Sequence, residues 1–300
     1  MAITNAHSDI LLPTQSNALP VVRTLTMYDL GDVLKKGLAD FWAMPTHIVF
    51  LCAIYPLVGL LLAHAAFTYD VFPILYPLAA GFALIGPIAA IGLYELSRRA
   101  ELGMDTSWSH VFDVVHSPSA APLAALAGLL LVIFGVWIAT AHALYVAAFG
   151  YEPLASPVAF AQKVLTTPAG HNLIIAGNAI GFVFAFLTAS LSVISFPLLL
   201  DHNVGFGAAV LTSLRVVAHN PLVMTAWFVI VAASLFVGSA LLFVGLAIAL
   251  PVLGHATWHL YRKAVEPDTS PRPEYRPRVP KGERYAADFP VSLVSRYFKK

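Results

Sequence analysis

The feature that most constrains this chain is a stretch of forty residues, 222–261, that contains no Asp, Glu, Lys or Arg. As one straight helix it would be about 60 Å long, at about 1.5 Å per residue. That is about twice the thickness of the hydrocarbon core of a bilayer. We therefore predict two membrane spans, 222–238 and 240–261, that turn near Gly238 and Ser239.

Four further apolar runs precede this stretch, and each is long enough to cross a bilayer. They cover residues 46–67, 71–96, 123–149 and 171–200. The composition also indicates a membrane protein, since 11% of the residues are charged, whereas soluble domains carry about 25% charged residues. The single cysteine excludes a disulfide framework and a thiolate metal centre. The expected fold class is an all-α membrane protein with six transmembrane helices, and we expect a kink near Pro87 in the second span.

The cations fall on one side of this layout. If the six spans alternate in direction, sixteen of the seventeen Lys and Arg residues lie on the side of the two termini, and only Lys163 lies on the other. The positive-inside rule then places both termini in the cytoplasm, with a multi-pass domain, 28–263, in the membrane. Residues 1–27 are expected to be loosely ordered, and the Pro-rich basic segment 264–300 to be an extended cytoplasmic tail.

An amphipathic stretch precedes each predicted pair of spans, with apolar residues at helical spacing. The three apolar stripes are Leu30, Val33, Leu34, Leu38 and Phe41; Trp108, Val111, Phe112 and Val115; and Phe206, Val210, Leu214 and Val217. Each stretch is expected to form a helix in the cytoplasmic membrane surface. The pattern indicates three hairpins related by a parallel repeat, in which 94–99 aligns with 258–263.

Polar residues gather at the predicted cytoplasmic ends of the second, fourth and sixth spans. They are Glu95, Asp201, His202, His255 and His259. If the hairpins pack around a shared centre, these residues form one polar layer, which would suit a proton or a metal ion. The alternative is that each lies within about two turns of the interface and is satisfied there by snorkelling or helix capping.

Metal and catalytic chemistry find less support. His255 and His259 share one helix face, but a divalent metal needs three or four ligands, so this pair is a weak candidate for a metal site. The sequence contains neither the Gly-x-Ser-x-Gly of hydrolases nor a phosphate-binding Gly-x-x-x-x-Gly-Lys. We expect no catalytic residue, no cofactor and no binding of nucleic acid.

Several residues near the span ends are predicted to anchor the helices at the membrane boundary. Aromatic side chains suit the headgroup level and cations suit the water beyond it. The predicted anchors are Trp258, Tyr261, Arg262, Lys263, Arg98 and Arg99.

Four segments of the sequence carry a recognisable pattern. They are Gly86-Pro87 with Gly-Leu-Tyr-Glu-Leu-Ser-Arg-Arg at 92–99 and Glu101, Ser-Phe-Pro-Leu-Leu-Leu-Asp at 195–201, Ala-Val-Leu-Thr-Ser-Leu-Arg at 209–215 with Asn220-Pro221, and Leu-Pro-Val-Leu-Gly-His-Ala-Thr-Trp-His-Leu-Tyr-Arg at 250–262. Together they resemble the bacterial integral membrane family catalogued as domain of unknown function 2189. The resemblance extends from about Arg23 to Lys263. It implies a bacterial inner-membrane protein with several spans, and it implies no activity.

The favoured interpretation is a non-enzymatic accessory, assembly or scaffolding component, in contact with the lipid bilayer and with other inner-membrane proteins. The alternatives are a transporter or channel for a small solute or ion and, less favoured, a membrane enzyme that acts on a lipid or a quinone. Convergence of Glu95, Asp201 and His255 on one water-accessible cavity would favour transport. Packing of each residue with partners of its own would count against it.

Overall fold

The structure is a computed structural model that describes residues 19–44, 64, 72–151, 156–240 and 245–267. All regular elements in these residues are helices, and one isolated antiparallel bridge pairs Val22 with Val265. The predicted all-α fold is therefore confirmed for this part of the chain. Apart from His64, the span predicted at 46–67 lies outside the described residues, as does the tail from residue 268.

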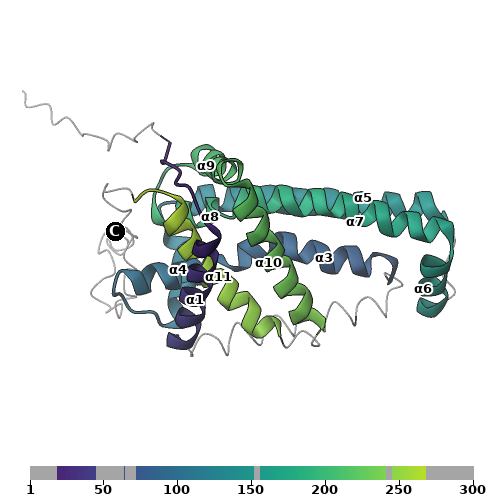
Figure 1. Cartoon of the computed structure of the whole chain (residues 1–300), viewed down its shortest axis with the longest axis horizontal. Coiled ribbons are helices and arrows are strands. Elements are labelled where there is room, and N and C mark those ends of the chain that lie inside the picture. The colour runs from purple at the N-terminus through teal and green to yellow at the C-terminus, as the bar shows by residue number, and fades with distance from the viewer. Residues whose placement is uncertain (1–18, 45–63, 65–71, 152–155, 241–244, 268–300) are drawn as a thin grey trace, which may run out of the picture.

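Two long helices define the long axis of the molecule, α5 (Ala120–Phe149) and α7 (Pro168–Ser192), which lie side by side in Figure 1. The short helix α6 (Pro157–Thr166) lies at the end where α5 finishes and α7 begins. A third helix, α3 (Phe72–Ala89), packs against both. Trp137 of α5 contacts both of the other helices: its Nε1 donates to the Pro77 carbonyl of α3 2.8 Å away, and its ring lies 5.6 Å from the Phe184 ring of α7.

Three stretches in the described residues are long and apolar enough to cross a membrane: Ala120–Phe149, Pro168–Asp201 and Pro221–Ala240. They correspond to the third, fourth and fifth predicted spans. The predicted total of six spans, their arrangement as hairpins and the internal repeat remain predictions.

Two of the predicted spans are each built from two helices. The prediction 71–96 corresponds to α3 and then α4 (Ile91–Glu101), with the break three residues after Pro87. A proline inside a helix removes one backbone hydrogen bond and crowds the preceding turn, so helices break or bend there. The prediction 171–200 corresponds to α7 and then α8 (Ser195–Asp201), in which Pro197 lies in the first turn. A proline is accommodated there because first-turn N–H groups have no partner within the helix.

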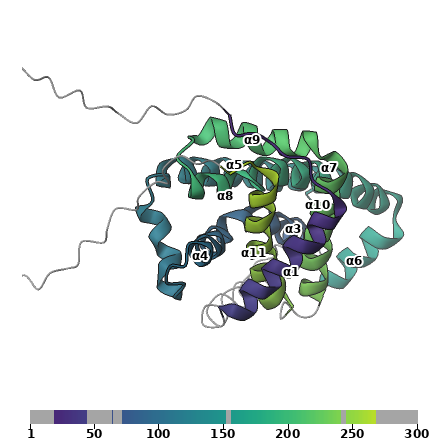
Figure 2. The ribbon, with the colours of Figure 1, turned by 60° about the vertical axis from the view of Figure 1, so that its left-hand side comes forward.

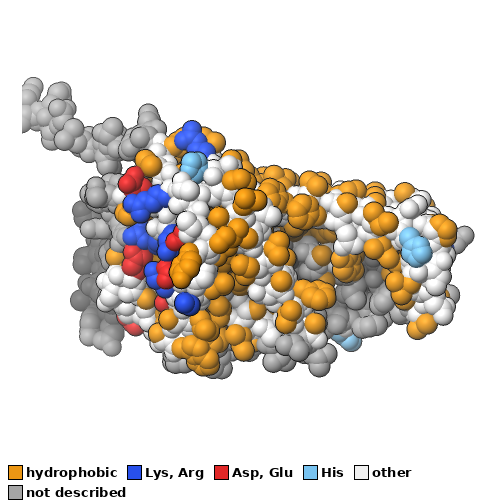
Figure 3. Space-filling model, in the orientation of Figure 1, with side chains coloured by type: hydrophobic (Ala, Val, Ile, Leu, Met, Phe, Trp, Pro, Cys, Tyr) orange, Lys and Arg blue, Asp and Glu red, His pale blue; other side chains and the backbone are white. Residues whose placement is uncertain are grey.

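The remaining elements gather at one end of the long axis, which we call the charged end (Figure 1 and Figure 2). It comprises α1 (Met27–Ala43), α4, the 3₁₀ helix η1 (Trp108–His116), α8, α9 (Phe206–His219) and the last turns of α11 (Leu246–Ala264). Helix α10 (Pro221–Ala240) leads away from α9 and packs against α11. The space-filling view shows the Lys, Arg, Asp and Glu side chains on this face collected at the same end (Figure 3).

Helix α1 contains the whole of the first amphipathic stripe, but the predicted exposure of that stripe to lipid is wrong in part. Leu30, Val33 and Phe41 are buried, and α1 packs on α11, while Leu38 is exposed. The close approach is possible because Gly37 has no side chain; a Cβ there would lie 2.7 Å from the Ala256 Cβ. Apolar periodicity alone does not distinguish a protein partner from a bilayer, so the pattern does not show which of the two the stripe meets.

The other two amphipathic stretches also form helices. In α9, Phe206 and Leu214 of the predicted stripe are exposed, whereas Val217 of the same stripe is buried. The buried residues of this helix are Ala209, Thr212, Ser213, Val216 and Val217. In η1 the exposed apolar side chains include Phe112 and Val115. Apolar side chains thus point out of the protein on both elements, which is compatible with the predicted location in the membrane surface.

Candidate functional site

The first polar group of the charged end joins α8, α4 and α11 through one arginine. Asp201, fully buried at the end of α8, accepts hydrogen bonds from the Tyr261 hydroxyl at 2.8 Å and from Arg262 Nη1 at 3.0 Å. Arg262 also donates from Nη2 to Glu101 Oε1 at 2.7 Å. Since these acids come from different helices, Arg262 links three helix ends at once.

A second group joins α1 to α4 and α11 around Asp40. Ser97 Oγ lies 2.8 Å from Asp40 Oδ2 and 2.7 Å from His255 Nδ1, and His259 Nε2 lies 2.9 Å from the same carboxylate oxygen. An ionised carboxylate only accepts, so the Ser97 hydroxyl donates to Asp40 and accepts from His255. Burial raises the pKa of Asp40, but the hydrogen bonds from His259 and Ser97, with the charges of both histidines, hold this pKa below its usual value.

A third group lies within α4. Glu95 is fully buried and binds Arg98 in a two-pronged manner, with Nε to Oε2 at 2.8 Å and Nη2 to Oε1 at 2.9 Å. Arg99 Nη1 lies 3.6 Å from Glu95 Oε1 and 3.6 Å from Asp113 Oδ2 of η1. Arg99 therefore extends the group from α4 to η1.

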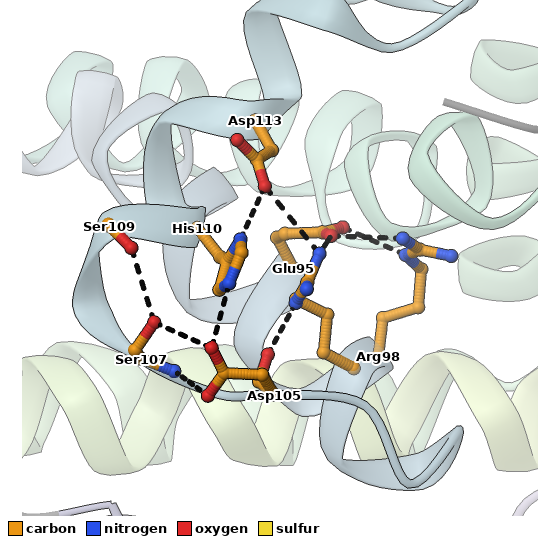
Figure 4. A network of polar contacts seen from close by, with 8 residues as sticks. Glu95, Arg98, Asp105, Ser107, Ser109, His110 and Asp113 are labelled. Atoms are coloured by element: carbon orange, nitrogen blue, oxygen red, sulfur yellow. Dashed lines mark hydrogen bonds and ion pairs between the residues drawn. The ribbon is translucent and has the colours of Figure 1, made fainter. Parts of the chain in front are cut away.

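The loop between α4 and η1 continues this network, as Figure 4 shows. Arg99 Nε donates to the Asp105 carbonyl at 2.6 Å. The His110 ring lies between two carboxylates, with Nε2 3.0 Å from Asp105 Oδ2 and Nδ1 2.5 Å from Asp113 Oδ2. Hydrogen bonds from Ser107 and His110 lower the pKa of Asp105. The result is a chain of charged groups that fixes the loop to α4.

A partly exposed ion-pair group connects the start of α1 to the end of α11. Lys263 Nζ lies 2.7 Å from Asp29 Oδ1 and 2.9 Å from Asp32 Oδ2. The hydrogen bond from Lys263, together with that from Thr26, lowers the pKa of Asp29 to about 2. Thr26 and Asp29 also form a capping box at the start of α1. The helix start and its contact with α11 therefore use the same carboxylate.

Asn220, between α9 and α10, holds the segment before α1. Its Oδ1 accepts from the Leu25 N–H at 2.7 Å and its Nδ2 donates to the Arg23 carbonyl at 3.1 Å. On the other side of this segment, Arg23 N–H donates to the Ala264 carbonyl and Glu266 N–H donates to the Val21 carbonyl. Residues 21–25 are therefore fixed on both sides, which differs from the loosely ordered segment predicted up to residue 27.

The five residues predicted to form one polar layer all lie at the charged end, but in three groups. His255 and His259 share Asp40 and Ser97, Glu95 pairs with the arginines of α4, and Asp201 lies with Arg262 and with His202, whose Nε2 is 3.2 Å away. Sequence reasoning missed the partner residues Asp40, Ser97, Glu101 and Asn220. Asp40, Glu101 and Ser97 lie on the polar edges of their helices, which the sequence shows. The sequence around them does not indicate which neighbouring helix each polar edge contacts.

The prediction of membrane anchors is wrong for four of the six residues. Trp258, Tyr261, Arg98 and Arg99 are buried within the protein, whereas Arg262 and Lys263 are partly exposed. The reason is that the polar ends of the four buried side chains find protein partners; the Trp258 indole, for example, donates to Glu101 Oε2 at 3.1 Å. A tryptophan with a satisfied N–H is stable in a protein interior.

The two histidines proposed as weak metal ligands are both engaged by the Asp40 group. Among the residues that the structure describes, no set of three or more His, Cys, Asp or Glu side chains is arranged to hold a metal ion.

Comparison with known proteins bears on the resemblance noted in the sequence. Residues 75–201 match the family model described as "Predicted integral membrane protein (DUF2189)". This range runs from α3 to α8 and includes Glu95, Arg98 and Asp201, while α1 and α11 lie outside it. The chain matches no curated protein and no solved structure. With its apolar helices and this match, the chain is an integral membrane protein that is similar, over residues 75–201, to the family described as DUF2189.

Proposed function

We propose that this chain is a non-enzymatic accessory, assembly or scaffolding component of the bacterial inner membrane, with both termini in the cytoplasm. The observation that carries the proposal is that the buried carboxylates pair with arginines of the protein itself. Glu95 and Asp201 are the two fully buried carboxylates of the described residues, and both bind guanidinium groups of the protein itself. Buried charges are costly unless paired, so each guanidinium group offsets the cost of burying its carboxylate; one pair joins α8 to α11 and the other lies within α4.

The division into three groups supports a structural role more than transport. A path for an ion or solute needs polar groups that face a common route and exchange partners during passage. Here Asp201 is held by α11, Glu95 by its own helix, and His255 by Ser97. The Asp201 group joins α8 to α11, and the Asp40 group joins α1 to α11. The Glu95 group lies within α4 and is connected to η1 through Arg99. Such separate, fixed contacts suit a rigid platform at the membrane surface.

The location in the membrane is supported by charge placement. The cations of the described residues gather at one end (Figure 3), and Lys163 lies on α6 near the opposite end. Such an asymmetry is typical of proteins whose positive end is cytoplasmic. Maleimide labelling of a Lys300→Cys variant in intact cells, compared with Val158→Cys on α6, tests this orientation. Labelling of residue 300 by a membrane-impermeant reagent would contradict it.

The scaffolding role is tested by photo-crosslinking in cells. A photoreactive amino acid is placed at Lys36 or Arg215, both exposed at the charged end, and at Val158 as the matched exposed control at the other end. We expect a discrete protein adduct at the first two positions and a stoichiometric partner after extraction in mild detergent. A protein that purifies alone and gives no adduct contradicts the proposal, and flux of protons or rubidium through vesicles that contain it would favour transport instead.

A further inference from the structure

Helix α1 has a second apolar face, separate from the one buried on α11. Met27, Tyr28, Leu38 and Trp42 are exposed, and Tyr28 and Trp42 have 92% and 71% of their surface accessible. At about 100° per residue these four side chains fall within an arc of roughly 100°. A soluble helix would place charged residues there, so this face needs an apolar or amphipathic neighbour.

The charges of α1 are distributed to leave this face nearly neutral. The acids Asp29, Asp32 and Asp40 lie on the opposite edge of the helix, where they meet Lys263 and His259. By helical spacing, the charged residue within the exposed arc is Lys35. Two aromatic rings, aliphatic side chains and one cation are the composition of a helix that lies in the boundary of an anionic bilayer.

The position of α1 in the fold also indicates that its exposed apolar face meets the lipid bilayer. In Figure 1 it runs across the long axis set by α5 and α7, so it would lie parallel to a membrane that these helices cross. It also contacts α10, one of the three candidate spans, whose outward side chains Leu222 and Phe236 are exposed. Figure 3 shows hydrophobic side chains both over the end of α1, at the bottom of the view, and over α10. The second face of α1 therefore continues the surface that faces lipid.

We propose that this face, formed by Met27, Tyr28, Leu38 and Trp42 with Lys35, binds the lipid bilayer at the level of the headgroups and the upper acyl chains. The contact would hold α1, and with it the ends of α4 and α11 that Asp40 joins, at the membrane surface. The aromatic rings suit the headgroup level and the aliphatic side chains the acyl chains. The Lys35 ammonium would meet anionic phosphate.

The test uses the full-length protein with Cys52 replaced by Ala and single spin labels on α1. Labels replace Tyr28, Leu38 or Trp42 on the proposed lipid face, and Lys36, which is about half exposed on the charged edge, is the matched control. The protein is reconstituted in nanodiscs of phosphatidylcholine and phosphatidylglycerol. Collision rates with oxygen, which partitions into lipid, and with an aqueous nickel chelate are measured at each position.

We expect the ratio of oxygen to nickel collisions to be several-fold higher at Leu38 and Trp42 than at Lys36. Tyr28 is almost fully exposed, so its label disturbs no packing and serves when another variant fails to fold. Equal ratios at all four positions would show that the face meets water and would overturn the proposal. Spin–spin broadening at Trp42 that disappears on dilution with unlabelled protein would assign the face to a second copy of the chain and would also overturn it.

Discussion

The contact between α1 and α11 depends on Gly37, and the structure allows the effect of an added methyl group to be worked out. In Gly37→Ala the new Cβ would lie 2.7 Å from Ala256 Cβ, 2.7 Å from Ala256 N and 2.7 Å from the Val252 carbonyl oxygen. Two of these atoms belong to the backbone of α11 and have no rotamer through which to move away. Ordinary contacts begin at 3.4 Å, so the helices must separate by the difference, 0.7 Å.

Two opposing effects determine how much Gly37→Ala changes the free energy of unfolding. Replacing a helical glycine by alanine stabilises a helix by about 1 kcal/mol, while overpacking of a close contact costs about 1–3 kcal/mol. Gly31→Ala on the same helix is the matched control, because a Cβ there meets none of the described atoms within 4 Å. The helix-propensity effect cancels between the two variants, so Gly37→Ala should be less stable than Gly31→Ala by about 1–3 kcal/mol.

The free energy of unfolding is measured by titrating the protein from mild detergent micelles into dodecyl sulfate, with circular dichroism as the signal. Hydrogen exchange of residues 27–43 then reports whether α1 is released first, as we expect for Gly37→Ala. If the two variants have the same unfolding free energy, or if Gly37→Ala is the more stable one, α1 does not pack on α11 through Gly37 and the reasoning is refuted.

Two further predictions concern the charged end. Asp201→Asn keeps the shape of the side chain but removes the charge that faces Arg262. It should lower the unfolding free energy by about 1.5–3 kcal/mol, the range for hydrogen bonds to charged groups. The same dodecyl sulfate titration measures this loss, and a change within about 0.5 kcal/mol, as for neutral surface sites, would contradict the prediction. Because the pKa of Asp29 is lowered to about 2 from 3.8, its ionised form stabilises the fold above pH 3.8, and this contribution is lost as the pH falls through about 2. In the Lys263→Met variant, the free energy of unfolding should therefore fall less steeply over this acid range than in the unchanged protein. Unfolding titrations between pH 6 and pH 2 measure this dependence. If the free energy falls equally steeply with pH in the variant and in the unchanged protein, the Asp29–Lys263 pair is not the source of the acid sensitivity.

The sequence alone was sufficient to place residues along the direction that crosses the membrane. Apolar runs locate α5, α10 and the continuous stretch of α7 and α8 to within a few residues, since each segment responds to lipid or water by its own composition. The same argument places Glu95, Asp201 and His255 at one common end. It also gives the helical character of the three amphipathic stretches, because periodicity is a local property.

The sequence could not show which side chains meet across that end. Asp40 and His259 are 219 residues apart in the chain and 2.9 Å apart in the structure, and Arg262 reaches Asp201 and Glu101 only because α4, α8 and α11 meet there. These pairings depend on how each helix is rotated and where it crosses its neighbours. Neither quantity is set by the hydropathy of one segment.

The faces of α1 illustrate the same division. Its sequence determined that it is an amphipathic helix with Leu30, Val33 and Phe41 on one side, but only the tertiary structure decided that this side packs on α11 and that Trp42 points outwards. The physical reason is that burial against protein and burial against lipid both remove apolar surface from water and are favoured by the same local pattern. The choice between them depends on close contacts such as that of Gly37 with Ala256, which form only when distant parts of the chain meet.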